Sequence, residues 1–312
     1  MTRRDRIDVA GALALGGLAF LFATNQIAIS VAVEGFAPAF AAALRSVIAA
    51  VVVALWLLAR GRPLGLGRRD AGRGLALGAA FAAEFLCLFH ALDLTTVPRA
   101  TIMLYSMPVW LAIGAHLLLP GERITPTRAA GLGLAFAGMA LALLSGSEAG
   151  SEAGSEAGAG DAKGDLRGDL LAVCAALGWA GLTLLARRAG ARGMGAETQL
   201  LWMLIGSAPV MAGAAALEGA VFRAPDLGSI LALLYQSVIV AAIGFLMWFR
   251  LLARYPASSV AAAGLLTPVL AIALGWAILG DPVGPGLLGA GALVIGGLVL
   301  VNRTGGQGTA RR

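Results

Sequence analysis

Charged residues are scarce in this chain of 312 residues. Asp, Glu, Lys and Arg make up 13% of it, about half their share in an ordinary soluble domain. Apolar residues make up 59%, and the mean hydropathy is +0.86. In water, so few charged side chains cannot cover so much apolar surface. The composition therefore excludes a soluble cytosolic enzyme, a disordered tail and a disulfide-stapled secreted module, and it predicts a polytopic membrane protein.

Cysteine, histidine and lysine are nearly absent, with two Cys, two His and one Lys. Cys87 and Cys174 each lie inside an apolar run, so we expect no disulfide framework. Two His and two Cys, far apart in the chain, also provide no zinc-binding pattern. A Gly follows Lys163, so a Walker A loop is missing, and so is the Gly-x-Ser-x-Gly elbow of hydrolases. We therefore expect no enzymatic activity, no cofactor and no metal site.

Long apolar runs, in contrast, are abundant. A membrane-spanning helix needs about 20 apolar residues, and the first run is longer than the ~7–15-residue core of a signal peptide. Backbone groups in lipid must be hydrogen-bonded within the segment, so each run should be a helix. The prediction is an all-α protein with ten transmembrane helices, approximately 7–32, 38–59, 73–94, 98–118, 126–145, 168–186, 197–217, 228–250, 257–279 and 286–302.

The basic residues lie mostly in the short gaps between these runs. This placement suits a surface of anionic lipid better than a nucleic-acid groove, so we expect no nucleic-acid partner despite a net charge of +6. With the N-terminus in the cytoplasm, eighteen Lys and Arg residues fall inside and four outside: Arg99, Lys163, Arg167 and Arg223. The positive-inside rule then predicts that both termini are cytoplasmic, in a bacterial-type inner membrane.

A polar segment at 146–166 interrupts the apolar runs. It contains three successive Ser-Glu-Ala-Gly units, a composition typical of a flexible linker. This linker separates five predicted helices in 7–145 from five in 167–303. Because five is odd, the second set must enter the membrane from the opposite side. Inverted repeats of this kind are the architecture of many secondary transporters.

The two halves share a weak motif, in which a Pro inside a span precedes a Gly-acid pair. The first half has Pro108 and Gly121-Glu122, and the second has Pro268 and Gly280-Asp281. With these motifs the chain resembles the drug/metabolite transporter superfamily, in its ten-helix EamA branch. Further matching segments are Ala91-Leu92-Asp93-Leu94-Thr95-Thr96, Gly168-Asp169-Leu170-Leu171-Ala172, Trp179-Ala180 and Tyr255-Pro256-Ala257-Ser258-Ser259.

The resemblance implies a transporter, since the family is known for exporting amino acids, metabolites and toxic compounds, and some members import. It names no cargo. We therefore expect a secondary-active exporter of small metabolites, amino acids or amphipathic toxic compounds that works by alternating access. The alternatives are an importer of the same fold, or a membrane protein that does not transport, such as an intramembrane enzyme or a scaffold. The expected partners are a small-molecule substrate and the bilayer; the oligomeric state stays open, with a monomer plausible.

Ionisable side chains inside spans are costly and are candidates for function. Glu84, about midway along its span, is able to bind a proton or a cationic group of the substrate. The alternative is a structural pair with Arg45, which the resemblance also places at a common family position. Tyr105 is a candidate for lining a central cavity, or a core aromatic residue with a satisfied hydroxyl. His90 and Asp93 share a helix face and are expected to pair with each other.

The remaining candidates are three polar or aromatic residues and two prolines. Asn25 and Trp179 are supported by their family positions and Gln236 by its depth in a span; all three are candidates for orienting the substrate. Pro108 and Pro268 each remove one amide donor and disturb the carbonyl four residues earlier. They indicate helix breaks at matching points, which serve either a binding site or packing.

Overall fold

The computed structural model describes residues 9–65, 67–118, 125–153, 165–254 and 264–303. Within these ranges the chain is almost entirely helical. The described residues contain no strand, only one isolated antiparallel bridge between Phe36 and Phe222. Helices leave no lipid-facing backbone group without a partner, which is the physical reason that so apolar a chain adopts them.

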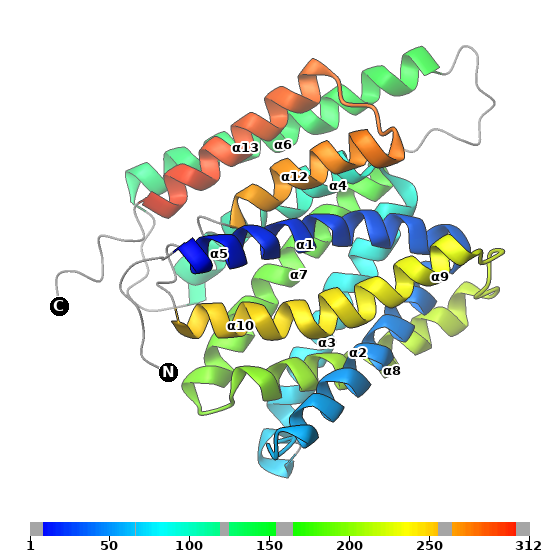
Figure 1. The fold of residues 1–312 in the computed structure, drawn as a ribbon. Coiled ribbons are helices and arrows are strands. Elements are labelled where there is room, and N and C mark those ends of the chain that lie inside the picture. The colour runs from blue at the N-terminus through cyan, green and yellow to red at the C-terminus, as the bar shows by residue number, and fades with distance from the viewer. Residues whose placement is uncertain (1–8, 66, 119–124, 154–164, 255–263, 304–312) are drawn as a thin grey trace.

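The described residues of the first half form six helices (Figure 1). They are α1 (Val9–Gly35), α2 (Pro38–Ala59), α3 (Arg68–Leu94), α4 (Val97–Leu104), α5 (Met107–Leu118) and α6 (Pro126–Ala153).

The second half contains α-helices and two π-helical segments, η1 and η2. They are α7 (Leu166–Ala191), α8 (Ala196–Glu218), α9 (Leu227–Leu234), η1 (Tyr235–Gly244), α10 (Phe245–Arg254), α12 (Leu266–Leu274), η2 (Gly275–Leu279) and α13 (Pro285–Arg303).

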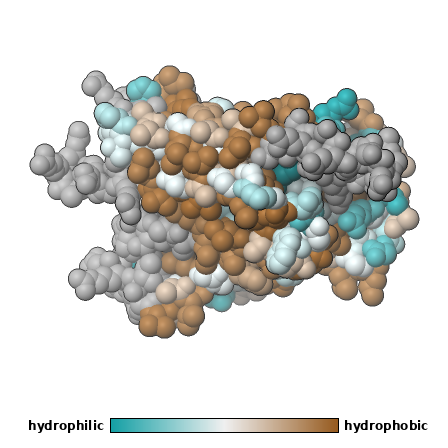
Figure 2. Space-filling view, turned by 90° about the horizontal axis from the view of Figure 1, so that it is seen from above, coloured by the Kyte–Doolittle hydropathy of each residue, from teal (hydrophilic) through white to brown (hydrophobic). Residues whose placement is uncertain are grey.

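Seven helical stretches of the described chain are long and apolar enough to cross a membrane. Three further helices are apolar but shorter than a full span: Ala129–Leu144, Leu266–Leu279 and Pro285–Leu300. Apolar side chains also dominate much of the molecular surface in Figure 2. The chain is therefore a polytopic helical membrane protein. The sequence predicts ten spans, and seven of the described helices have the full length of a membrane span.

Helix α6 continues into the segment expected to be a flexible linker. It ends at Ala153, and α7 begins at Leu166, where the Asp165 side chain accepts a hydrogen bond from the backbone N–H of Arg167. Ala and Glu are strong helix formers, so the first Ser-Glu-Ala-Gly units extend the helix they follow.

The prolines lie directly after interruptions of the helices. Helix α4 ends at Leu104, and α5 starts at Met107, one residue before Pro108. In the second half, Leu265 is in a turn just before α12, which contains Pro268. Both interruptions fall two or three residues before the proline, in the turn with which its ring clashes.

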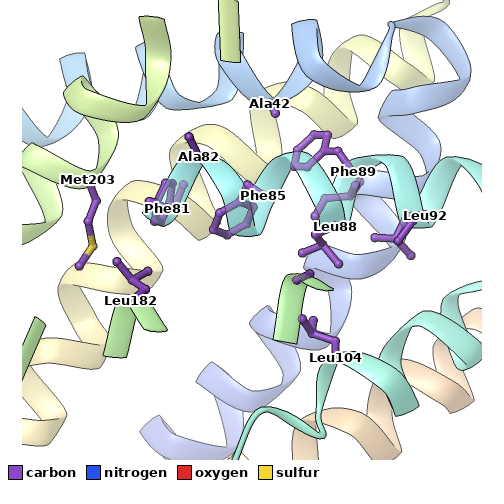
Figure 3. Close-up of a cluster of buried hydrophobic side chains, with 14 of the residues drawn as sticks. Ala42, Phe81, Ala82, Phe85, Leu88, Phe89, Leu92, Leu104, Leu182 and Met203 are labelled. Carbon is purple, nitrogen blue, oxygen red and sulfur yellow. The ribbon is translucent and has the colours of Figure 1, made fainter. Parts of the chain in front are cut away.

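Three predicted spans of the first half pack against the predicted span of the same rank in the second half: the second spans pair, as do the fourth and the fifth. Helix α2 packs on α8, α4 on α12, and α6 on α13; the last pair lies side by side along one edge of the molecule in Figure 1. Helix α3 contacts α1, α2, α7 and α8, and its Phe81, Phe85, Leu88, Phe89 and Leu92 belong to the main apolar cluster (Figure 3). Helix α3 is therefore the element around which both halves assemble.

Candidate functional site

The centre of the candidate site is a pair of opposite charges, Arg45 on α2 and Glu84 on α3. Arg45 is 0% exposed and Glu84 is 6% exposed. The two side chains interact electrostatically. However, all three guanidinium nitrogens of Arg45 and the Oε2 atom of Glu84 lack a hydrogen-bond partner among the described residues. The two side chains are therefore neighbours, but they form no hydrogen-bonded ion pair in the described structure.

Aromatic rings take the place of hydrogen-bond acceptors around Arg45. The guanidinium carbon lies 4.0 Å from the centroid of the Phe85 ring and 5.8 Å from that of Phe81. Both rings come from α3, one turn apart, on the helix that carries Glu84. The cation–π contacts offset part of the cost of burying the charge. The N–H donors remain available for an anionic oxygen.

Tyr105 and Trp179 connect this charged pair to the second half. Gly178 packs so closely on α3 that a Cβ atom there would lie 3.0 Å from the Cα of Glu84. The next residue, Trp179, meets the ring of Tyr105 edge-on, with 5.9 Å between the ring centroids. The Tyr105 hydroxyl interacts in turn with the side chain of Thr267 on α12. A continuous set of contacts therefore runs from Arg45 through Tyr105, in the α4–α5 interruption, to Thr267 on α12.

A second polar group lies on α1 and η1. Thr24 and Tyr235 are joined by a hydrogen bond of 2.6 Å between their hydroxyls. The neighbouring Asn25 and Gln236 are 8% and 0% exposed. Asn25 Oδ1 and both side-chain polar atoms of Gln236 have no hydrogen-bond partner in the described chain. A wide π-helical turn at Gln236 is a feature often found at functional sites.

Sequence reasoning missed a third cluster, here called the clasp: Thr95, Val97, Arg99, Asp169 and Asp281. Asp169 accepts hydrogen bonds from Thr95 Oγ1 (2.9 Å) and Arg99 Nε (3.2 Å), and its other oxygen pairs with Arg99 NH2. The Asp281 carboxylate accepts from the backbone N–H of Val97 at 3.0 Å. The clasp joins the halves where the chain passes from α3 to α4, where α7 begins and where η2 has ended.

The loop-charge count places Arg99 among the four outer basic residues. It is only 8% exposed, and Asp169 is fully buried. The sequence contained one indication of the clasp, the acid Asp169 next to Gly168. Only the resemblance to the transporter family singled out that residue. The Gly121-Glu122 pair and the Tyr255–Ser259 segment lie outside the described residues.

The expected pairing of His90 with Asp93 is wrong. His90 Nε2 lies 2.7 Å from Glu218 Oε1, and Asp93 accepts a 2.6 Å hydrogen bond from Arg223. Glu218 also accepts from the backbone N–H of Ala39, in the first turn of α2. His90 and Asp93 do lie on adjacent turns, but each pairs with a side chain from the second half, Glu218 and Arg223 respectively.

Comparisons with known proteins agree with this architecture. The model of the EamA-like transporter family matches the chain twice, over residues 9–144 and 166–303. A solved crystal structure shares the fold, with a TM-score of 0.64 and 24% identity over 94% of this chain and 96% of the other.

Two relatives are similar over most of their length. An uncharacterized protein of Pseudomonas aeruginosa is 30% identical over 262 residues, which are 83% of this chain and 82% of that protein. A probable terminal-alkyne amino-acid exporter of Streptantibioticus cattleyicolor is 28% identical over 288 residues, 88% of each chain. Two family matches that together cover most of the sequence lead to one conclusion: the chain belongs to the EamA-like transporter family.

Proposed function

We propose that this protein is a secondary-active transporter with ten spans in two inverted five-helix repeats, 7–145 and 167–303, joined by a linker at 146–166. The pairing of α2 with α8, α4 with α12 and α6 with α13 supports two equivalent halves. The three shorter apolar helices would bring the seven full-length spans to ten. Both termini would then be cytoplasmic, as the basic loops predict.

The observation that carries this proposal is the buried pair Arg45 and Glu84, whose guanidinium nitrogens and Oε2 atom have no hydrogen-bond partner among the described residues. Glu84 lies near the middle of the span Asp70–Leu94, and its neighbour Arg45 has no hydrogen-bond partner in the described chain. Charges in such a place are retained at a cost in stability and mark substrate or ion pathways. We assign the substrate to this region, with Asn25, Gln236 and the Tyr105–Trp179 edge as further contacts.

Alternating access would come from motion of one half against the other around that site. Pro108 and Pro268 follow interruptions at corresponding places, which would let the two parts of each span move separately. The name of the Streptantibioticus relative favours export, and amino acids among the possible substrates. Import by the same fold and a protein without transport activity remain the competing functions.

A growth-protection screen tests transport and its direction. Cells overexpressing the protein are challenged with amino-acid analogues, including a terminal-alkyne amino acid, with nucleoside analogues and with cationic dyes. We expect protection against one chemical class, and its loss in Glu84→Gln. Glu197→Gln is the matched control, because its partner Arg62 lies at a solvent-exposed position.

Sensitisation of the cells instead of protection would indicate uptake. Neither effect with any compound, at normal membrane abundance, would contradict transport of these classes. A pH series on the same cells tests whether Glu84 binds the coupling proton: Glu84→Gln should then remove the pH dependence of protection. An unchanged pH profile in a variant that still transports would exclude that role.

A further inference from the structure

We propose that Arg45 and Glu84 form a clamp for a zwitterion, in which the guanidinium binds a carboxylate and the Glu84 carboxylate binds an ammonium group of the same molecule. The inference rests on the proposed transport function and deepens it, because it specifies the charge pattern of the substrate. An amino acid is the simplest molecule with this pattern.

The first step of the argument is the unused donor capacity of Arg45. A guanidinium has five N–H donors in a planar fork that matches a carboxylate. All three nitrogens are buried here and none donates within the described chain. The contact with Phe85, at 4.0 Å from the ring centroid, provides no acceptor oxygen. A carboxylate is therefore the ligand that this group is best suited to bind.

The second step is the counter-charge beside it. Glu84 interacts electrostatically with Arg45, yet its buried Oε2 has no hydrogen-bond partner in the described residues. A substrate with only a carboxylate would be attracted by Arg45 and repelled by Glu84. A substrate with only an ammonium group would meet the opposite conflict. A zwitterion satisfies both charges, so repulsion of the wrong partners contributes to selectivity.

The third step is the environment of the pair. Phe81 and Phe85 lie on one side of Arg45, and the α7 backbone at Gly178 seals α3 beside Glu84. Water excluded from such a site cannot screen the charges, which strengthens charge-assisted hydrogen bonds to a ligand. Because Arg45 is fully buried, the clamp must open to admit the substrate, as alternating access requires.

Ligand-induced thermal stabilisation of the purified protein tests the clamp. The probes are the proteinogenic amino acids, their methyl esters, which keep only the ammonium group, and the corresponding deaminated acids, which keep only the carboxylate. We expect one or more amino acids to raise the Tm, while the ester and the deaminated acid with the same side chain do not. In Arg45→Gln and Glu84→Gln, the half-saturating concentration should rise about tenfold to hundredfold.

Matched controls separate binding from folding. Arg250→Gln removes a guanidinium that stacks on Trp56 at 4.8 Å, and Glu197→Gln removes the partner of Arg62; both should bind like the wild type. Arg45→Glu combined with Glu84→Arg keeps a pair of opposite charges, so a purely structural pair would recover both stability and binding. We expect the exchanged pair to recover stability but not binding. With the two charges exchanged, the substrate would have to bind in the reverse orientation, and its side chain would point to the wrong part of the site.

Three results would overturn the clamp: stabilisation by the ester or the acid equal to that by the amino acid, unchanged affinity in both Gln variants, or no stabilisation by any amino acid. The growth-protection screen distinguishes failure of the clamp from failure of the proposed transport function. Protection against a cationic dye without amino-acid binding would leave the transporter and remove the clamp. Amino-acid binding without protection or sensitisation would leave the clamp and remove the transport function.

Discussion

Individual buried charges in this protein have two kinds of environment. In the clasp, Asp169 accepts hydrogen bonds from both Thr95 and Arg99, so its charge is compensated within the protein. At the candidate site, Arg45 has no hydrogen bond within the described chain. Compensated charges hold a structure together, whereas uncompensated ones are costly and persist where a ligand needs them. This contrast separates the clasp, which we interpret as structural, from the pair to which we assign the substrate.

The clasp pair should contribute strongly to stability. Asp169→Asn leaves the buried Arg99 without its counter-charge, which should lower the free energy of unfolding by about 3–5 kcal/mol. Thermal unfolding in detergent measures the change. Asp70→Asn is the matched control, because its 3.3 Å pair with Arg73 is partly exposed and should contribute about 0–1 kcal/mol. Equal shifts in the two variants would contradict a structural role for the clasp.

The Asp226 cap of α9 predicts a pH dependence at the residue scale. Asp226 accepts a hydrogen bond from the backbone N–H of Ser229 (2.8 Å), and this bond lowers the pKa of the carboxyl from 3.8. Because the pKa of Asp226 is lower in the folded state than in the unfolded chain, the ionised carboxyl stabilises the fold at pH values above the unfolded pKa. This contribution is lost as the pH falls through the folded pKa. Asp226→Ala should therefore unfold at a lower temperature than the wild type at pH 7, and the difference should shrink in acid. A constant difference across the pH range would count against the cap.

At the scale of elements, small residues determine how closely the helices approach. Helices α3 and α8 cross at Gly78 and Gly206, where a Cβ atom on Gly78 would lie 2.5 Å from the Cα of Gly206. Helices α6 and α13 meet similarly, since a Cβ on Gly297 would lie 2.5 Å from the carbonyl oxygen of Gly131. In lipid, such close backbone packing is a main source of association between helices.

Gly78→Ala should force α3 and α8 apart, with a cost of about 1–3 kcal/mol typical of overpacking. Because α3 carries Glu84, binding or transport should weaken as well. Gly133→Ala on α6 is the control, since a Cβ there meets no atom within 4 Å and Ala favours a helix. The two variants are compared by thermal unfolding, and a Gly78→Ala protein as stable as the control would argue against this crossing.

At the scale of the whole molecule, the arrangement of charges sets the orientation in the membrane. The end of α7 and its connection to α8, with Arg187, Arg188 and Arg192, should be cytoplasmic, whereas the segment between α8 and α9 has Arg223 as its single basic residue. Arg223 is itself paired with Asp93. The positive-inside rule thus rests on a contrast with few outer basic residues, and two of these, Arg99 and Arg223, are paired with acids within the fold.

Cysteine accessibility in intact cells tests this orientation. In a background with Cys87 and Cys174 replaced by Ala, Pro225→Cys should react with a membrane-impermeant maleimide added outside. Ala196→Cys should react only after the cells are permeabilised. Both positions are exposed, so a reversed pattern would mean that the protein has the opposite orientation.

The sequence by itself determined the class of protein, a polytopic membrane protein built from helices. Lack of charge and long apolar runs required membrane helices, because lipid offers the backbone no other hydrogen-bond partners. Pro108 predicted the disturbance at Leu104, where α4 ends, because a proline acts on its own turn. The resemblance to the EamA family is likewise confirmed, since its motifs depend on local order and spacing.

Only the tertiary structure decided which charges meet. Asp169 pairs with Arg99, seventy positions away in the chain, and Asp93 with Arg223, 130 positions away. Helical periodicity places a side chain on a face but carries no information about which distant helix covers that face. For the same reason, the sequence left open whether Arg45 and Glu84 pair. Whether the two side chains hydrogen-bond to each other depends on differences of a few ångströms in their positions, which are fixed only when α2, α3 and α7 pack together.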